Sequence, residues 1–151
     1  MSWKAKLDEL GIALPPVPTP AGAYVPAVRS GSLVYTSGQV PLRDGKPLAT
    51  GKVGADVSPE QAKDLARTCA LNALAAVDAL VGLDSVVRVV KVVGFVASAE
   101  GFGGQPGVIN GASELLGEVF GEAGQHARSA VGVAELPLNV PVEVELIVEV
   151  S

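Results

Sequence analysis

The sequence predicts a single α+β domain in which helices cover one face of a β-sheet. Two long segments have the apolar spacing of amphipathic helices, and several others show the alternation or β-branched content of strands. These segments follow one another in the order β-β-α-β-α-β-β, which is the pattern of a layered α+β fold. The 151 residues suit one domain, so we treat residues 1–151 as a single unit whose first 22 residues form a helix and a proline-rich strap.

The composition excludes several classes of protein. Hydrophobic residues make up 48% of the chain and charged residues only 18%, which favours a packed core over disorder. The net charge is −5 and no run of basic residues occurs, so we expect no nucleic-acid partner. No apolar segment has the form of a signal peptide or the length of a membrane span. We therefore expect a cytoplasmic protein with no membrane partner.

The first 50 residues predict a helix, an extended strap and a hairpin. Trp3, Leu7 and Leu10 recur at helical spacing, so a short amphipathic helix is expected before Gly11. Residues 14–20 contain four prolines and predict an extended, polyproline-like segment. Strands are predicted over residues 24–29 and 33–37, joined by a turn, and a second turn is predicted at residues 43–46.

The clearest helix signal begins at Ser58, which we interpret as an N-cap followed by Pro59 in the first turn. Gly82 ends the helix. Its predicted buried stripe consists of Ala62, Leu65, Ala66, Cys69, Ala73, Ala76, Val77 and Leu80.

The second half of the chain predicts three strands and one helix. The strands cover residues 86–97, 128–134 and 142–150, and a glycine-rich loop at 100–107 leads into a helix over 108–120. The strand at 86–97 is apolar at most positions, so both of its faces should be buried. Helices can cover one face, and a second copy of the chain is the economical cover for the other. The sequence therefore predicts a homo-oligomer.

Several common catalytic motifs are absent from the sequence. Cys69 and His126 are the only cysteine and histidine, so no cysteine-based zinc site or two-histidine metal site can form, and we expect no metal. Ser37 lacks the nucleophile-elbow motif and is better explained by hydrogen bonding. Cys69 lies on the helix stripe, where a cysteine usually acts as a small buried hydrophobe.

Arg128 and Glu143 are the informative charged residues. Strand alternation places Arg128 on one face with Ala130 and Gly132, so its guanidinium has space beside it to bind a carboxylate in two-pronged fashion. The alternative is a structural ion pair with Glu143 or Glu145. Glu143 shares a polar strand face with two further glutamates, which is typical of a solvated face but also admits a catalytic carboxylate.

Two segments at opposite ends of the chain resemble the signatures of the Rid/YjgF family of reactive intermediate deaminases. The first is Ala23-Tyr24-Val25 with the segment GSLVYTSGQVP at 31–41. The second is ARSAVGVAELP at 127–137, followed by VPVEVE at 140–145. The resemblance extends over nearly all of residues 24–150, and the predicted order of elements agrees with it.

The resemblance implies a chorismate-mutase-like subunit, with helices on one face of a mixed sheet, that forms homotrimers with pockets between subunits. The implied activity is the hydrolysis of 2-aminoacrylate, 2-iminopropanoate and similar acids to 2-oxo acids and ammonia, with no cofactor. By resemblance, Arg128 holds the substrate carboxylate, Glu143 positions or activates water, and Tyr24, Ser37 and Ala130 line the pocket. Ala130 stands where many members have cysteine, so only a main-chain contact is expected there.

Two other functions stay open at the level of sequence. The same arginine pocket could serve a non-catalytic protein that binds small carboxylates. The family is also described as endoribonucleases and translation inhibitors, although the acidic chain gives RNA binding little support. The N-terminal helix, the strap and the loop at 97–107 resemble features of a longer subgroup of the family.

Overall fold

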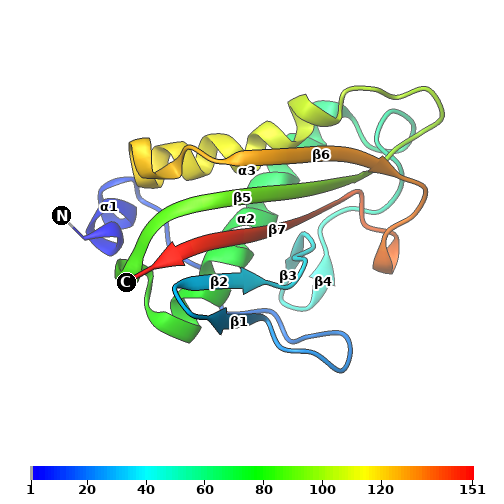
Figure 1. Cartoon of the computed structure of the whole chain (residues 1–151). Coiled ribbons are helices and arrows are strands. Elements are labelled where there is room, and N and C mark those ends of the chain that lie inside the picture. The colour runs from blue at the N-terminus through cyan, green and yellow to red at the C-terminus, as the bar shows by residue number, and fades with distance from the viewer. Residues whose placement is uncertain (1) are drawn as a thin grey trace.

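Two helices pack against one face of a five-stranded sheet in the computed structural model, which describes residues 2–151 (Figure 1). The sheet has the strand order β1-β2-β7-β5-β6, with all neighbours antiparallel except the parallel pair β5 and β6. The strands are β1 (Ala27–Ser30), β2 (Leu33–Thr36), β5 (Val86–Ala97), β6 (Ala127–Val133) and β7 (Val142–Val150). The α+β class, the mixed sheet and the order of the main elements are thus confirmed.

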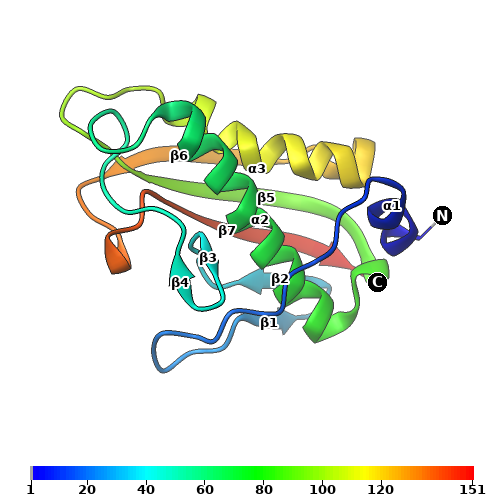
Figure 2. The same ribbon diagram turned by 180° about the vertical axis from the view of Figure 1, so that it is seen from behind.

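Helices α2 (Pro59–Val81) and α3 (Gln105–Phe120) lie side by side on the same face of the sheet, which is turned toward the viewer in Figure 2. The opposite face carries no helix and is seen directly in Figure 1. A small separate hairpin, β3 (Leu42–Arg43) and β4 (Lys46–Pro47), forms around the turn predicted at residues 43–46. None of the helices within residues 2–151 has the length and hydropathy needed to span a bilayer.

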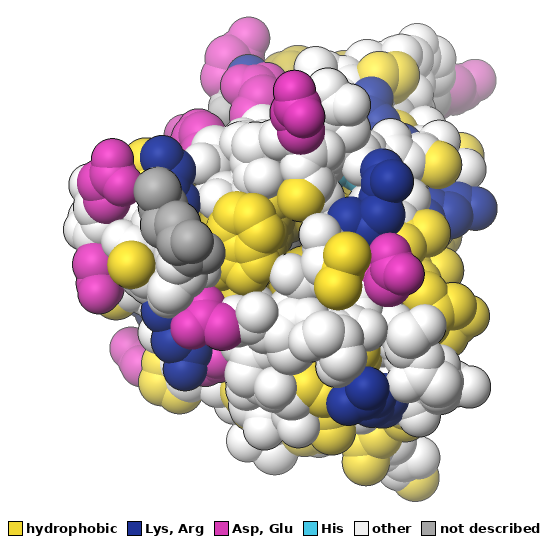
Figure 3. Space-filling model, turned by 60° about the vertical axis from the view of Figure 1, so that its left-hand side comes forward, with side chains coloured by type: hydrophobic (Ala, Val, Ile, Leu, Met, Phe, Trp, Pro, Cys, Tyr) yellow, Lys and Arg dark blue, Asp and Glu magenta, His cyan; other side chains and the backbone are white. Residues whose placement is uncertain are grey.

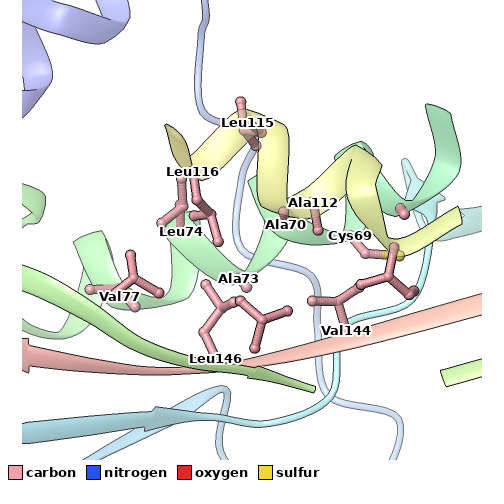
Figure 4. Packing of buried hydrophobic residues seen from close by; sticks show 14 of the residues in the cluster. Cys69, Ala70, Ala73, Leu74, Val77, Ala112, Leu115, Leu116, Val144 and Leu146 are labelled. Atoms are coloured by element: carbon pink, nitrogen blue, oxygen red, sulfur yellow. The ribbon is translucent and has the colours of Figure 1, made fainter. Parts of the chain in front are cut away.

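The core lies between the helices and the sheet. Figure 4 shows Cys69 and Ala73 of α2 above Val144 and Leu146 of β7, and these small side chains let α2 approach the sheet closely. Gly111 of α3 sits where a Cβ would overlap the main-chain carbonyl of Lys63 on α2, which fixes the crossing of the two helices. The labelled core residues are Cys69, Ala70, Ala73, Leu74, Val77, Ala112, Leu115, Leu116, Val144 and Leu146.

Helix α2 begins as predicted, because the Ser58 hydroxyl accepts a hydrogen bond from the Gln61 main-chain N–H. Its predicted apolar stripe is buried except for Leu80, which is 45% exposed because the helix extends past the edge of the core there. Helix α3 starts at Gln105 and not at Val108 as predicted. The first turn of a helix tolerates Pro106, because the N–H that proline lacks is not needed there. The helix can therefore begin earlier, and the glycine-rich loop is shorter than expected.

The first strand also differs from the prediction. It begins at Ala27, three residues later than expected, and residues 21–24 form a bend in which the Tyr24 hydroxyl accepts a hydrogen bond from the Ala21 N–H. Pro20 and Pro26 restrict the backbone on either side of this bend. Pro26 also has no N–H to donate to a neighbouring strand, so the sheet cannot extend back through it. Tyr24 therefore lies in a loop and not in the sheet.

The N-terminal segment is attached to the body of the fold at both ends. The predicted first helix is confirmed as α1 (Trp3–Glu9), whose Trp3 indole donates a hydrogen bond to the Val86 carbonyl at 2.8 Å and packs on Phe120. Leu7 is buried. The strap then runs across the outer side of α2 toward β1, as Figure 2 shows.

Candidate active site

A cleft of about 270 Å³ opens beside β7, between the strap and the segment that follows β2. Three parts of the chain that are distant in sequence form it: the strap and the bend after it, the end of β2 with β3, and the start of β7 with the 3₁₀ turn before it. The lining residues are Pro18, Thr19, Pro20, Ala21, Tyr24, Pro26, Gly38, Gln39, Val40, Leu42, Pro137, Leu138 and Glu143.

Glu143 is the only charged residue that lines this cleft. It belongs to β7 and points to the open face of the sheet, because its neighbours Val142 and Val144 are buried under the helices. Burial raises the pKa of Glu143, and the nearby Glu145 carboxylate raises this pKa further. A Cβ at Gly38 would overlap the Glu143 carboxylate oxygen, so glycine there leaves room for the side chain in this position. Glu143 is therefore a half-buried carboxylate held ready to accept a proton.

Tyr24 and Ser37 lie at the same end of the sheet. Tyr24 lines the cleft and is 49% exposed. The Ser37 hydroxyl donates a hydrogen bond to the Val25 carbonyl at 2.6 Å, and its N–H donates to the Pro26 carbonyl, so Ser37 ties the bend to the end of β2. The structure brings Tyr24, Ser37 and Glu143 into one region, which we call the β7 half-site.

Arg128 lies elsewhere, on the edge strand β6. Arg128 pairs with Val92 of β5, which in turn pairs with Leu146 of β7. Paired residues on neighbouring strands point to the same face of the sheet, and Val92 and Leu146 are both buried under the helices, so the Arg128 side chain also points to the helix face. The structural ion pair with Glu143 or Glu145 is thus wrong for the single chain, since both carboxylates point to the opposite face. Nη1 of Arg128 instead donates to Oδ1 of Asn110 at 2.7 Å and to Oγ of Ser113 at 3.2 Å, both on α3.

These contacts leave one edge of the Arg128 guanidinium open. Both hydrogen bonds use Nη1, and within residues 2–151 neither Nε nor Nη2 donates to another group. The edge that carries Nε and Nη2 is the one that binds a carboxylate with two parallel hydrogen bonds. Arg128 is thus oriented by α3 and can still bind a carboxylate.

A chain of hydrogen bonds extends from Arg128 to His126. Ser113 Oγ lies 2.9 Å from Nε2 of His126, and Nδ1 of His126 lies 2.6 Å from the Gly124 carbonyl oxygen. A carbonyl only accepts, so Nδ1 carries a proton and donates to Gly124. Ser113 Oγ accepts from Arg128 and also contacts Nε2 of His126, so the serine joins the arginine to the histidine ring.

Arg128, Asn110 and Ser113 form what we call the β6 half-site, with Ala130 half-buried beside them on the same strand face. Sequence reasoning missed Asn110 and Ser113. They are three residues apart on α3 and therefore share one side of that helix. This polar pair beside the apolar stripe of α3 was the available signal. The β6 half-site faces the helices and the β7 half-site faces the open side of the sheet, so one chain does not bring Arg128 and Glu143 together.

The remaining histidine, cysteine and acidic side chains of residues 2–151 form no metal site. Within residues 2–151 no cluster of three or more histidine, cysteine, aspartate or glutamate side chains is placed to hold a metal ion. Cys69 is fully buried, and burial followed by the charge of Glu143 raises the pKa of its thiol well above the usual value. This agrees with its interpretation as a core residue.

Comparison with known proteins places the chain in a family. The model of the family described as Endoribonuclease L-PSP matches residues 16–150. Protein TCP17 of Trypanosoma cruzi is 46% identical, over 97% of this chain and 93% of its own length. A 2-iminobutanoate/2-iminopropanoate deaminase of Salmonella typhimurium is 39% identical, over 90% of this chain and 94% of its own.

The fold agrees with these sequence matches. The crystal structure of Atu1372 from Agrobacterium tumefaciens, a protein described as of unknown function, superimposes with a TM-score of 0.89 at 48% identity, covering 99% of this chain and 92% of that one. Family match, named relatives and fold all point the same way, and the chain belongs to the Endoribonuclease L-PSP family, the Rid/YjgF family that its two signatures resemble.

Proposed function

We propose that this protein hydrolyses short 2-imino acids and their enamine forms to 2-oxo acids and ammonia, at sites shared between the subunits of a homotrimer. The observation that carries the proposal is the division of the site. One chain presents an arginine with an open carboxylate-binding edge on β6, and a half-buried glutamate in a cleft beside β7. The open face of the sheet, on which Glu143 lies, carries exposed apolar side chains that a second copy would cover, including Val28, Tyr35 and Val131.

In the proposed reaction, Arg128 of one subunit holds the carboxylate of the 2-imino acid while Glu143 of the next subunit holds a water beside C2. Glu143 accepts a proton as the water oxygen bonds to C2 and the C=N electron pair moves to nitrogen. Glu143 returns this proton to the nitrogen. It then transfers the proton of the new C2 hydroxyl to the nitrogen as well, so that the C–N bond breaks, ammonia leaves and the hydroxyl becomes the C2 carbonyl. The imine is already electrophilic, so orientation of water supplies much of the catalysis. A carboxyl with a raised pKa suits a group that must both accept and return a proton.

The direct test is to generate 2-aminoacrylate in situ and to measure 2-oxo acid formation with and without the protein. Arg128→Lys keeps the charge but loses the two-pronged edge, so it should bind pyruvate or 2-oxobutanoate roughly ten- to a hundredfold more weakly in calorimetry. Glu143→Gln should keep binding and slow turnover. Arg67→Lys, on the surface of α2, and Glu149→Gln, farther along β7, are matched controls that should behave as wild type.

If Arg128→Lys binds the oxo acid as tightly as wild type, the carboxylate clamp is wrong. If the oxo acid binds but no 2-imino acid is turned over faster than in buffer, the protein is instead a carboxylate-binding protein. RNA cleavage is disfavoured by the net charge of −5 and by the face in Figure 3, where acidic and basic side chains are interspersed and no continuous basic band forms. Cleavage of a mixed-sequence RNA that is lost in Arg128→Ala, purified in parallel, would reverse this ranking.

A further inference from the structure

We propose that the cleft beside Glu143 is a subsite for an apolar substrate side chain, and that the preferred substrates are 2-imino acids with branched aliphatic side chains, ahead of 2-iminopropanoate. The inference rests on the proposed function and refines its substrate.

The lining of the cleft is mostly apolar. Nine of its residues are proline, alanine, valine, leucine or tyrosine: Pro18, Pro20, Ala21, Tyr24, Pro26, Val40, Leu42, Pro137 and Leu138. The lining contains no lysine, arginine or histidine, so an acidic substrate side chain would be left unpaired there. An aliphatic side chain would instead exchange water for apolar contact.

The polar groups gather where the reacting atoms would lie. Glu143 borders the cleft, and so does Gln39, which is only 6% exposed. The Gln39 side-chain amide makes no hydrogen bond within residues 2–151. Its nitrogen and oxygen are not fully buried either, so the amide stays accessible at the cleft that Gln39 lines. A carboxylate and an unpartnered amide thus face an otherwise apolar space, which is the usual arrangement of a small-molecule site.

Leu138 is held against the cleft by a strained backbone. Its φ is 60° and ψ is 15°, and Asn139 follows with a φ of 57°. Leucine rarely adopts this left-handed conformation, which persists only where the surroundings impose it and which concentrates at functional sites. Here the Asn139 N–H donates to the Leu136 carbonyl and the Asn139 carbonyl accepts from the Gly51 N–H. The result is a leucine that is 54% exposed and lines the cleft.

The strap provides the facing wall and is fixed in advance. The proline rings restrict its backbone, helix α1 anchors one end through Trp3, and the Tyr24 hydroxyl holds the other end at the Ala21 N–H. A preformed wall lowers the cost of ordering on binding. The volume of about 270 Å³ is slightly below the range of roughly 300–1,000 Å³ typical of drug-sized ligands, which suits an amino-acid-sized substrate with a side chain larger than methyl.

Calorimetric titration with product analogues tests the subsite separately from catalysis. Wild type should bind 4-methyl-2-oxopentanoate at least about tenfold more tightly than pyruvate, because hydrophobic pockets discriminate by roughly tenfold or more per methylene. Leu138→Asn should reduce this ratio toward one, since asparagine tolerates the left-handed conformation and replaces the apolar wall with a polar one. Leu80→Asn is the matched control, because Leu80 is also an exposed leucine but lies at the end of α2, and it should keep the wild-type ratio.

Equal binding of the two acids by wild type, or tighter binding of pyruvate, would overturn the subsite. So would a Leu138→Asn protein with an unchanged ratio. Turnover of imines generated from L-leucine and L-alanine by an amino-acid oxidase then separates the two proposals. Selective binding without accelerated imine hydrolysis supports the subsite and refutes the deaminase, whereas hydrolysis without selective binding supports the deaminase and refutes the subsite.

Discussion

Glu143 shares the open face of the sheet with Glu145, two residues farther along β7, and partial burial together with this neighbour raises the pKa of its carboxyl. A raised pKa means that the folded protein holds the Glu143 proton more tightly than the unfolded chain does. The contribution of Glu143 to stability is therefore most favourable below the unfolded pKa of about 4.3 and is lost as the pH rises through the folded pKa. At neutral pH the ionised carboxylate lowers the stability of the fold.

Glu143→Gln should therefore unfold at a higher temperature than wild type at pH 7.5, because the amide keeps the shape and removes the buried charge. The difference should shrink toward zero as the pH falls to about 3, well below the unfolded pKa, where the wild-type carboxyl is protonated in both states. Thermal unfolding followed by circular dichroism at a series of pH values is the measurement. A variant that is less stable than wild type at pH 7.5 would show that the carboxylate makes a favourable contact that outweighs its desolvation.

Ser113 links Arg128 to the His126 ring, and its removal tests whether α3 orients the arginine. Ser113→Ala should keep the bond from Arg128 to Asn110 but lose one of the two anchors of Nη1. We expect roughly a two- to twelvefold loss in affinity for a 2-oxo acid, because one hydrogen bond contributes about 0.5–1.5 kcal/mol. Ser113→Thr, which retains the hydroxyl, should recover most of the affinity, and failure of both variants would indicate a packing defect.

At the scale of elements, the close crossing of α2 and α3 depends on one glycine. A Cβ at Gly111 would overlap the Lys63 carbonyl, whereas a Cβ at Gly117 on the same helix would meet open space. Gly111→Ala should force the helices apart and cost on the order of 1–3 kcal/mol or more of unfolding free energy. Gly117→Ala should instead stabilise the protein by about 0.5–1 kcal/mol. Urea unfolding of both variants beside wild type measures the two effects, and a stable Gly111→Ala protein would show that α3 can move.

The elements that the sequence predicted correctly are those whose signals are local. Helix α2 carries its own N-cap at Ser58, and β7 alternates along its whole length, so neither depends on distant contacts. The start of β1 was missed because Tyr24 has high strand propensity, whereas the prolines around it and the hydrogen bond to Ala21 impose a bend. The sequence identified Arg128 and Glu143 as candidate site residues. Alternation within each strand, however, did not reveal that the two side chains lie on opposite faces of the sheet. That result follows from the register of β6 through β5 to β7.

At the scale of the whole molecule, the open face of the sheet determines the expected assembly. Exposed apolar side chains on β1, β2 and β6 lie on the face opposite the helices, and burying them between copies would provide the hydrophobic term that a stable oligomer requires. Light scattering at micromolar concentration should therefore give about three times the mass of one 15.2 kDa chain. A monomer that stays well behaved at this concentration would contradict both the trimer and the shared site.

The division of the site between subunits makes a stronger prediction about mixed oligomers. Arg128→Ala and Glu143→Gln homo-oligomers should each turn over poorly, because every site lacks either the clamp or the base. If each site takes Arg128 from one subunit and Glu143 from the next, a trimer assembled from equal amounts of the two variants contains sites with both residues intact. In random assembly, the subunit that supplies Arg128 to a site has an intact Arg128 in half of the cases, and the subunit that supplies Glu143 has an intact Glu143 in half of the cases. About a quarter of the sites are therefore intact, and activity should return to about a quarter of the wild-type value.

The experiment requires co-expression or unfolding and refolding of the mixture, since preformed trimers exchange subunits only when they dissociate. Variants purified separately and mixed without refolding serve as the control and should show no recovery until exchange occurs. Recovery after co-assembly is expected because the β6 and β7 half-sites lie on opposite faces of the sheet within one chain. If co-assembled variants stay as inactive as the separate ones while remaining trimeric, each chain must complete its own site, and the arrangement of Arg128 against α3 would have to change on substrate binding.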